Sequence, residues 1–211
     1  EAANGYADKV EVVLYKDGSV SVEDNGRGIP TDIHKQAGVS GVQVVFTQLH
    51  AGGKFNNDNY SFSGGLHGVG ASVTNALSEW LEVEVYNKVV YKMRFHSYYA
   101  PSRKKVISGE PVAPLEKTKI KTDKHGTFVR FKPDAKVFET VEFNLETIAK
   151  RLRELAFLNK GITIKLTDLR DDDKFYSKTF KYDGGLIDYV LYLNEGKQKL
   201  YDLPVYAKTE R

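Results

Sequence analysis

The sequence predicts an α+β fold, a two-layer sandwich in which helices cover one mostly antiparallel sheet. Two segments, 10–24 and 80–99, alternate apolar and polar residues with the period of two that is typical of a half-buried strand. The first contains Asp17-Gly18, a dipeptide that favours a tight turn, so each segment is expected to fold back as two antiparallel strands. Predicted strands outnumber predicted helices, which makes the sheet the larger layer.

Three helices and three further strands complete the predicted sandwich. Each helix shows apolar residues at spacings of three and four, and the longest one has Asn144 as a candidate N-cap and Gly161 as its stop. The helices are expected over 39–49 (apolar stripe Val42, Val45, Phe46, Leu49), 69–77 (Val69, Val73, Ala76, Leu77) and 145–160 (Leu145, Ile148, Ala149, Leu152, Leu155, Ala156), and the strands over 126–133, 162–168 and 175–182.

The pattern changes after Gly184-Gly185, where a short amphipathic helix is expected over 186–193. We therefore predict a domain boundary near Tyr182, with one domain over 1–182 and the start of a second over 183–211. At the other end, the first residues resemble the last turn of a helix stopped at Asn4-Gly5, so an element is expected to precede them.

Composition limits the classes of protein that need to be considered. The 211 residues are 41% hydrophobic and 28% charged, which is typical of a globular protein with a sizeable core. No apolar run approaches the roughly 18 residues of a membrane span, and the absence of cysteine excludes disulfides and thiol catalysis, so we expect a cytoplasmic protein. The formal charge of +3 is too small to indicate nucleic-acid binding by itself. The seven basic residues between 100 and 126 are interpreted as a solvated sheet edge, with nucleic-acid binding as the alternative.

Asp24 is the first candidate for a ligand contact. It follows Val20 and Val22 at a spacing of two, so its carboxylate is expected to point the same way as two core valines. A carboxylate that faces a core needs partners, and it can either cap the turn of "DNGRGIP" or accept a hydrogen bond from a ligand, for which the exocyclic amine of a purine fits. Gly26 and Gly28 would let the backbone approach a flat ligand closely.

A glycine-rich stretch, "GLHGVG" over 65–70, forms the second candidate. It matches neither the dinucleotide fingerprint nor a P-loop, but it opens directly into the helix expected over 69–77. Free backbone N–H groups and the positive end of the helix dipole would converge there, which is the geometry that binds phosphate. The alternative is a flexible hinge before the helix. Lys54 could add a counter-charge or be an ordinary surface lysine.

Thr127 is a conditional third candidate. It shares a face of the strand over 126–133 with two apolar residues, and its hydroxyl matters only if it lies beside Asp24, where it could orient a water or the same ligand amine. His50 and His67 lack the paired spacing of a zinc site, and no arrangement of Ser, His and Asp is indicated. We therefore assign neither a metal ligand nor a nucleophile.

Five motifs in this order resemble the ATPase domains of bacterial type IIA topoisomerases. The match covers nearly the whole chain. The short motifs recur in the wider superfamily of gyrase, Hsp90, histidine kinases and MutL. The combination of "LHAGGKF" with "SGGLHGVG" looks specific to the topoisomerases. The motifs are "DNGRGIP" (24–30), "LHAGGKF" (49–55), "SGGLHGVGASVTNALS" (63–78), "GTFVRFKPD" (126–134) and "RLRELAFLNKG" (151–161).

The resemblance implies a Bergerat ATP site that can be carried over residue by residue. Asp24 resembles the adenine-binding carboxylate and Thr127 its partner beside a bound water. The remaining implied contacts are Gly28, Ile29, Lys54 and Tyr60 around the nucleotide, Gly65, Leu66, His67, Gly68, Val69, Gly70 and Ala71 in the phosphate loop, and Glu1, Arg27 and Pro30 at an inhibitor-binding rim, where Glu1 pairs with Arg27.

The same resemblance implies ATP and Mg²⁺ as ligands, but the catalytic end of the family's site has no match in this chain. The family's general-base glutamate and magnesium-binding asparagine align before Glu1, and the lysine that reaches the γ-phosphate aligns beyond Arg211. No catalytic residue is therefore assigned. The intact protein is expected to hydrolyse ATP, to dimerise and to act with gyrase A on DNA, whereas this chain is expected to be a monomer that binds ATP or an adenine-site inhibitor with little turnover.

Three alternatives to a gyrase B-type protein remain at this point. The B subunit of topoisomerase IV shares every motif named above. A chaperone or sensor-kinase ATPase domain of the same superfamily is disfavoured by "LHAGGKF" and by the lack of a phosphoacceptor histidine box. A nucleic-acid module that uses the lysines of 103–124 would show steep salt dependence.

Overall fold

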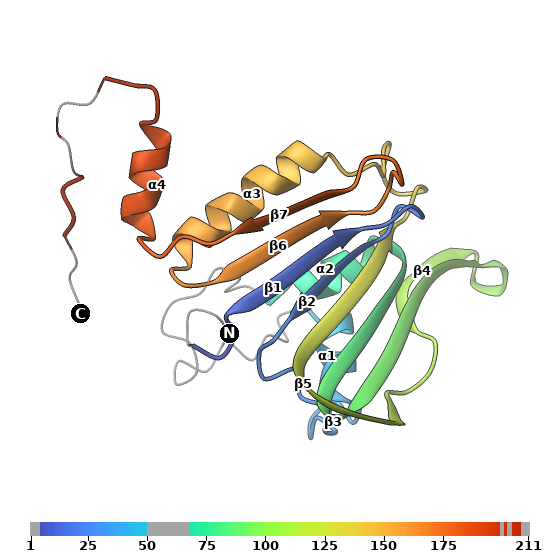
Figure 1. Cartoon of the computed structure of the whole chain (residues 1–211). Helices are drawn as coiled ribbons and strands as arrows, with labels where there is room; N and C mark the ends of the chain where they lie inside the picture. The colour runs from blue at the N-terminus through green and yellow to red at the C-terminus, as the bar shows by residue number, and fades with distance from the viewer. Residues whose placement is uncertain (1–4, 50–67, 199–200, 202–203, 208–211) are drawn as a thin grey trace.

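The chain folds as a seven-stranded sheet with helices packed on one face. A computed structural model describes residues 5–49, 68–198, 201 and 204–207. Its elements are β1 (Lys9–Leu14), β2 (Val20–Asp24), α1 (Gly41–Thr47), α2 (Gly70–Ala76), β3 (Ser78–Ala100), the 3-10 helix η3 (Pro101–Arg103), β4 (Lys105–Pro111), β5 (Glu116–Pro133), α3 (Leu145–Leu158), β6 (Thr163–Asp168), β7 (Tyr176–Phe180) and α4 (Leu186–Leu193). This arrangement confirms the predicted α+β sandwich (Figure 1).

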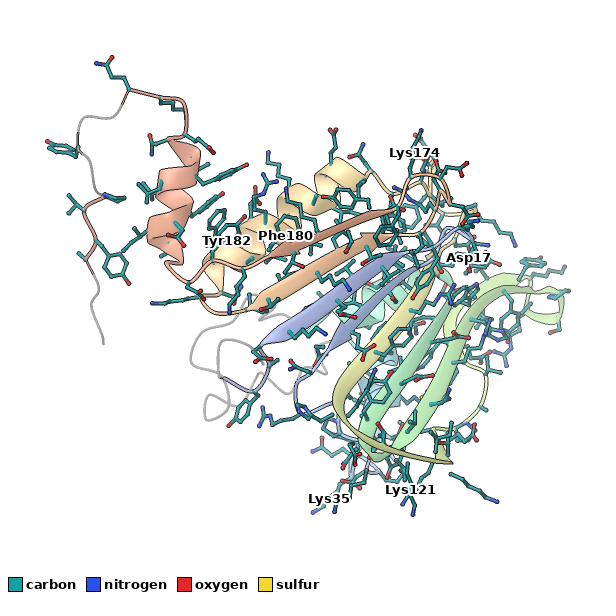
Figure 2. The ribbon with its side chains drawn as sticks, viewed as in Figure 1. Asp17, Lys35, Lys121, Lys174, Phe180 and Tyr182 are labelled. Carbon is teal, nitrogen blue, oxygen red and sulfur yellow. The ribbon has the colours of Figure 1, made fainter. Side chains whose placement is uncertain are left out.

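The sheet is mostly antiparallel, as the alternating sequence predicts. Its strand order is β4-β3-β5-β2-β1-β6-β7, and every neighbouring pair is antiparallel except β1 and β6. β1 and β2 form the hairpin expected at Asp17-Gly18, with Leu14 opposite Val20. Asp17 and the turn lie at one end of the sheet, and Lys35 and Lys121 lie at the other (Figure 2).

The long element β3 folds back on itself. An extended strand rises about 3.3 Å per residue, so residues eight or more positions apart cannot touch unless the chain reverses. Lys92 nevertheless lies 2.6 Å from Glu84, and the Ser97 hydroxyl donates to the Ser78 carbonyl at 2.7 Å. Lys88, between these pairs, has a φ of 59°, which is turn geometry. β3 is therefore the second predicted hairpin, with arms over 78–86 and 89–100.

Two hydrophobic clusters separate the helices into groups. The first joins α3 to the β1, β6 and β7 side of the sheet, and the second joins α1 to the β3 side. Phe131 of β5 packs against both clusters, so both lie on the same face of the sheet. The buried members of the first are Val12, Leu14, Val20, Ala149, Ala156, Ile162, Ile164, Leu166 and Phe180, and those of the second are Val42, Phe46, Leu81, Val83, Val85, Met93 and Phe95.

α3 is the helix that the sequence predicts best. Asn144 caps it as expected, because its side-chain oxygen accepts a hydrogen bond from the backbone N–H of Thr147 at 2.8 Å. Its C-terminal end contacts α4: the ring of Phe157 stacks on Tyr182 with centroids 3.6 Å apart and lies 5.0 Å from Tyr189. Figure 2 labels Phe180 and Tyr182, which lie beside α3 at the end of the sheet nearest α4.

The two shorter helices depart from their predicted apolar stripes. α1 begins after Ser40, whose hydroxyl accepts from the N–H of Gln43, and it ends at Thr47, so Leu49 lies beyond it and is exposed. α2 buries Ser72 and Asn75 instead of Val73, which is 41% exposed. The Asn75 side-chain N–H donates to the carbonyls of Phe46 and Gly109, each at 2.9 Å. Hydrogen bonding to two neighbouring segments therefore orients this helix against its hydrophobic pattern.

Val73 and Leu77 face an apolar groove between α2 and the segment that leads into α3. The groove encloses about 260 Å³. Phe131, Phe138 and Phe143 form its other walls. Along the described ranges, no helix is long and apolar enough to cross a membrane.

Candidate functional site

The site begins where β2 ends, at the pair formed by Asp24 and Thr127. The antiparallel register sets these two residues directly opposite each other on β2 and β5, which holds their Cβ atoms about 4.5–5.5 Å apart. Thr127 is 6% exposed, and its hydroxyl oxygen accepts a hydrogen bond from the backbone N–H of Ile29 at 3.2 Å. A hydroxyl has one donor as well, so Thr127 can still donate. The condition set on Thr127 by the sequence, that it lie beside Asp24, is met.

Asp24 is half-buried, not fully buried, and it organises its own turn. Its Oδ1 accepts from the backbone N–H of Gly26 at 2.7 Å. The capping role and the ligand role are therefore compatible, because a carboxylate offers about four lone-pair directions.

Val22 corrects one premise of the prediction for Asp24. It lies on the helix-covered face, opposite the buried Val12 and next to Val129, yet it is 37% exposed. Val20, two residues earlier, is buried in the first cluster. The strand therefore leaves the core between Val20 and Val22, and Asp24 lies beyond the point where the two clusters separate.

Two glycines let the backbone after β2 cross close to β5. Gly126 has a φ of +116°, and a Cβ there would overlap the carbonyl oxygen of Asp24. Gly28 has a φ of +82°, and a Cβ there would meet a methyl group of Val85 at 3.0 Å and the carbonyl oxygen of Gly126 at 3.1 Å. Both positions require glycine because the two strands pass each other without room for a side chain.

Asn25 and His125 hold this crossing in place, and the sequence interpretation assigned a role to neither. The Asn25 side-chain oxygen accepts from the N–H groups of Asp8 and Lys9, and its amide donates to the Asp8 carboxylate at 2.6 Å. His125 Nδ1 lies 2.8 Å from the carbonyl oxygen of Gly26. The position of Asn25 inside "DNGRG" is the only sequence signal for it, since Asn is a turn former.

The segment after Gly28 forms one wall of the site. Ile29 packs against the second cluster, and Pro30 is exposed, with its carbonyl beside Gly41 at the start of α1. The guanidinium of Arg27 lies over the ring of Tyr6, 3.7 Å from its centroid. Tyr6 thus contacts Arg27 through a cation–π interaction. The predicted partner of Arg27, Glu1, lies outside the described residues.

α2 begins at Gly70, close to the end of the predicted phosphate loop. Val69 is the N-cap, and no side chain caps the helix there. The first N–H groups of such a helix lack intrahelical partners. Gly68, with a φ of 60°, Val69, Gly70 and Ala71 are thus the described part of the predicted loop. Lys54, Tyr60, Gly65, Leu66 and His67 lie outside the described residues.

The charges around β2 are mostly compensated by neighbours on the helix-free face. Lys124 pairs with Glu23 at 2.9 Å, and Lys9 pairs with Glu11, which lowers the pKa of the Glu11 carboxyl through its hydrogen bond. Burial raises the pKa of the Tyr86 phenol, so this side chain stays neutral and donates to Glu84 at 3.2 Å. Among the described residues, no group of three or more His, Asp or Glu side chains could hold a metal ion.

Comparisons with known proteins identify the family. Residues 1–137 match the family described as histidine kinase-, DNA gyrase B-, and HSP90-like ATPase. The chain belongs to this ATPase family. Its relatives include the B subunit of DNA gyrase from Thermotoga maritima, 51% identical over all of this chain, and that from Staphylococcus aureus strain Mu50, 50% identical over 98% of it.

A solved structure of the same family shares the fold. The 43K ATPase domain of Thermus thermophilus gyrase B, solved in complex with an aminocoumarin, aligns with a TM-score of 0.75 and 35% identity over 97% of this chain and 48% of that one. The chain spans 31% of the Thermotoga maritima protein and 30% of the Staphylococcus aureus protein. The family and the ATPase fold are thereby established, and the predicted resemblance is confirmed.

Proposed function

We propose that this chain is the nucleotide-binding part of a gyrase B-type protein and that it holds adenine against Asp24. The observation that carries the proposal is the pairing of Asp24 with Thr127 beside the exposed Val22, where β2 leaves the core. A carboxylate and a hydroxyl at that edge can accept from and donate to a purine, while Val22 and Ile29 offer apolar surface to its rings. Gly28 and Gly126 bring the two strands close enough for one flat ligand to touch both.

The phosphates are proposed to lie toward the start of α2. Gly70 and Ala71 begin the helix without a side-chain cap, so their backbone N–H groups suit an anion. The contributions proposed for Lys54, Tyr60, Gly65, Leu66, His67, Gly68 and Val69 rest on the family resemblance of the sequence. Glu1, Arg27 and Pro30 are proposed as the rim for inhibitors on the same basis.

In the whole protein, we propose that ATP hydrolysis drives DNA strand passage and negative supercoiling together with gyrase A, in a dimer and in the cytoplasm. The names of the relatives support the gyrase type over the topoisomerase IV type. Mg²⁺ is proposed as the metal of that reaction, but the described residues do not form a site for it, so no step is derived through the metal. We also propose that 183–211 begins a second domain, after a boundary near Tyr182.

The test is the affinity of this chain for a non-hydrolysable ATP analogue, measured by calorimetry. Asp24→Asn replaces a charged acceptor by a weaker, neutral one. The expected loss is that of a hydrogen bond to a charged group, about 1.5–3 kcal/mol, or roughly 10- to 150-fold in Kd.

Asp183→Asn is the matched control, because Asp183 is exposed and distant from β2 along the chain. It removes the same charge and should leave the Kd unchanged. An adenine-site gyrase inhibitor should respond to Asp24→Asn in the same direction as the analogue. Equal affinity of the Asp24→Asn variant and the unaltered chain would overturn the adenine assignment.

A further inference from the structure

A two-stranded ribbon projects at the β4 edge of the sheet. The second arm of β3 and β4 are joined by η3 and Lys104, with Ala100 opposite Lys105 and Tyr99 opposite Val106. All six residues of 101–106 are exposed. β4 is the terminal strand of the sheet (Figure 1). The ribbon tip is therefore accessible from both faces.

The base of this ribbon is fixed to the body. The Ser97 hydroxyl donates to the Ser78 carbonyl and accepts from the N–H of Gly109 at 3.0 Å. Asn75 of α2 donates to the carbonyl of Gly109. Hydrogen bonds at the base hold the tip in a defined direction, which lowers the entropy that a partner must remove on binding.

Three consecutive basic residues, Arg103, Lys104 and Lys105, form the tip. None of them makes an ion pair within the described part of the chain, whereas on the adjoining sheet Arg94 pairs with Glu82 and Lys92 with Glu84. The ribbon itself, 95–111, contains three basic residues and one acidic residue, a formal charge of +2 within a chain whose net charge is +3. The basic side chains of the ribbon are therefore not compensated by described ion pairs, in contrast to Arg94 and Lys92 on the adjoining sheet.

Exposed aromatic and apolar side chains accompany these charges. Tyr99 is 55% exposed and its cross-strand neighbour Val106 is 61% exposed. The ring of Tyr98 lies 4.7 Å from that of His96, and its hydroxyl donates to Glu110. A cross-strand pair of an aromatic and a β-branched residue contributes up to about 1 kcal/mol to the sheet. Because both side chains are also exposed next to the basic tip, they offer apolar surface to a partner.

We propose that this ribbon tip binds the phosphate backbone of duplex DNA without sequence preference. Unpaired, clustered Lys and Arg side chains are the groups that displace counterions from DNA phosphates. A two-stranded β-ribbon is narrow enough to enter the major groove, where the tyrosines can pack against sugar and base edges. An acidic protein surface would gain from the same charges but would not need so narrow a projection. The proposal rests on the proposed function in that DNA is the partner of the whole protein, and it adds the surface of this chain that contacts the DNA; it does not depend on the adenine assignment.

The experiment measures binding of this chain to a fluorescent 30-base-pair duplex at salt concentrations from 50 to 200 mM, without nucleotide. Three phosphate contacts give a slope of log K against log salt of about −2.7, hence a roughly 40-fold loss of affinity over that range. The variant Arg103→Ala/Lys104→Ala/Lys105→Ala should abolish most of this dependence. Tyr99→Ser should weaken binding several-fold and leave the slope unchanged.

The matched control is Lys117→Ala/Lys119→Ala/Lys121→Ala. It removes three exposed positive charges from the first residues of β5, outside the ribbon. It should retain most of the salt slope, and both triple variants should unfold at the temperature of the unaltered chain. Asp24→Asn should bind DNA normally, which separates this proposal from the adenine assignment. Equal loss in the control triple, no salt-dependent binding by the unaltered chain, or stronger binding to polyglutamate or RNA would each overturn the proposal.

Discussion

Val12 and Val22 are direct neighbours across the β1–β2 hairpin, and they have opposite environments. Val12 is 6% exposed in the cluster that α3 covers, whereas Val22 is 37% exposed on the same face of the same sheet. Covering a strand with a helix yields stability, and leaving its neighbour open yields a surface on which a ligand can lie. The chain therefore separates its core from its candidate site within a single hairpin.

The backbone crossing between β2 and β5 should be the most sensitive point of this arrangement. Gly126→Ala introduces a Cβ that overlaps the carbonyl oxygen of Asp24, and it also forces alanine to a φ of +116°. We expect a loss of about 3 kcal/mol or more in the free energy of unfolding, measured by urea titration, together with loss of nucleotide binding.

Gly161→Ala is the control for that substitution. Gly161 also has a positive φ, of +87°, but no atom lies within 4 Å of the added Cβ. It should therefore cost only the conformational strain, about 1–2 kcal/mol, and preserve nucleotide binding. If the two variants are equally stable, the crossing does not constrain the site in the way described.

The valine pair tests the comparison directly, because the two substitutions are chemically identical. Val12→Ala removes two buried carbons and leaves a cavity, so the expected loss in unfolding free energy is about 2 kcal/mol with little effect on the nucleotide Kd. Val22→Ala should cost about 0.5 kcal/mol in stability and weaken nucleotide binding instead. Reversed effects on stability would show that Val22, not Val12, belongs to the core.

An ion pair at the far end of the sheet sharpens the comparison through pH. Asp168 accepts from Arg170 at Nε (2.9 Å) and at Nη2 (2.7 Å), and these hydrogen bonds lower the pKa of the Asp168 carboxyl below its ordinary value of 3.8. A carboxyl whose pKa is depressed on folding contributes stability above its unfolded pKa and loses it as the pH falls through the folded pKa.

Asp168→Asn should therefore cost about 1.5 kcal/mol at neutral pH and flatten the loss of stability below pH 3.8. Urea titrations between pH 2 and 7 measure this, with Asp183→Asn as an exposed carboxyl control. Nucleotide affinity at neutral pH should be unchanged in both variants, because this pair lies in the supporting part of the sheet. If the free energy of unfolding falls as steeply below pH 3.8 in Asp168→Asn as in the unaltered chain, the role assigned to Asp168 is wrong.

Much of the fold could be predicted because its signals are local. Alternation and a turn dipeptide located the β1–β2 hairpin, and a cap, an apolar stripe and a stop glycine located α3. α2 was mispredicted in its buried face, because the two hydrogen bonds of Asn75 to Phe46 and Gly109 come from segments 29 and 34 residues away. A periodicity argument contains no information about such partners.

The candidate site, like the fold, was predictable only where its signals are local. The sequence by itself determined that Asp24 ends a strand, that glycines flank it, and which family the motifs resemble. Only the tertiary structure decided that Thr127 lies opposite Asp24, that Gly126 must lack a side chain, that Asn25 clamps β1, and that Val22 is open while Val12 is buried. The physical reason is that the pairing of β2 with β5 joins residues 103 or more positions apart, such as Asp24 and Thr127. Burial in turn depends on which helix covers a strand, so neither property is encoded in local spacing.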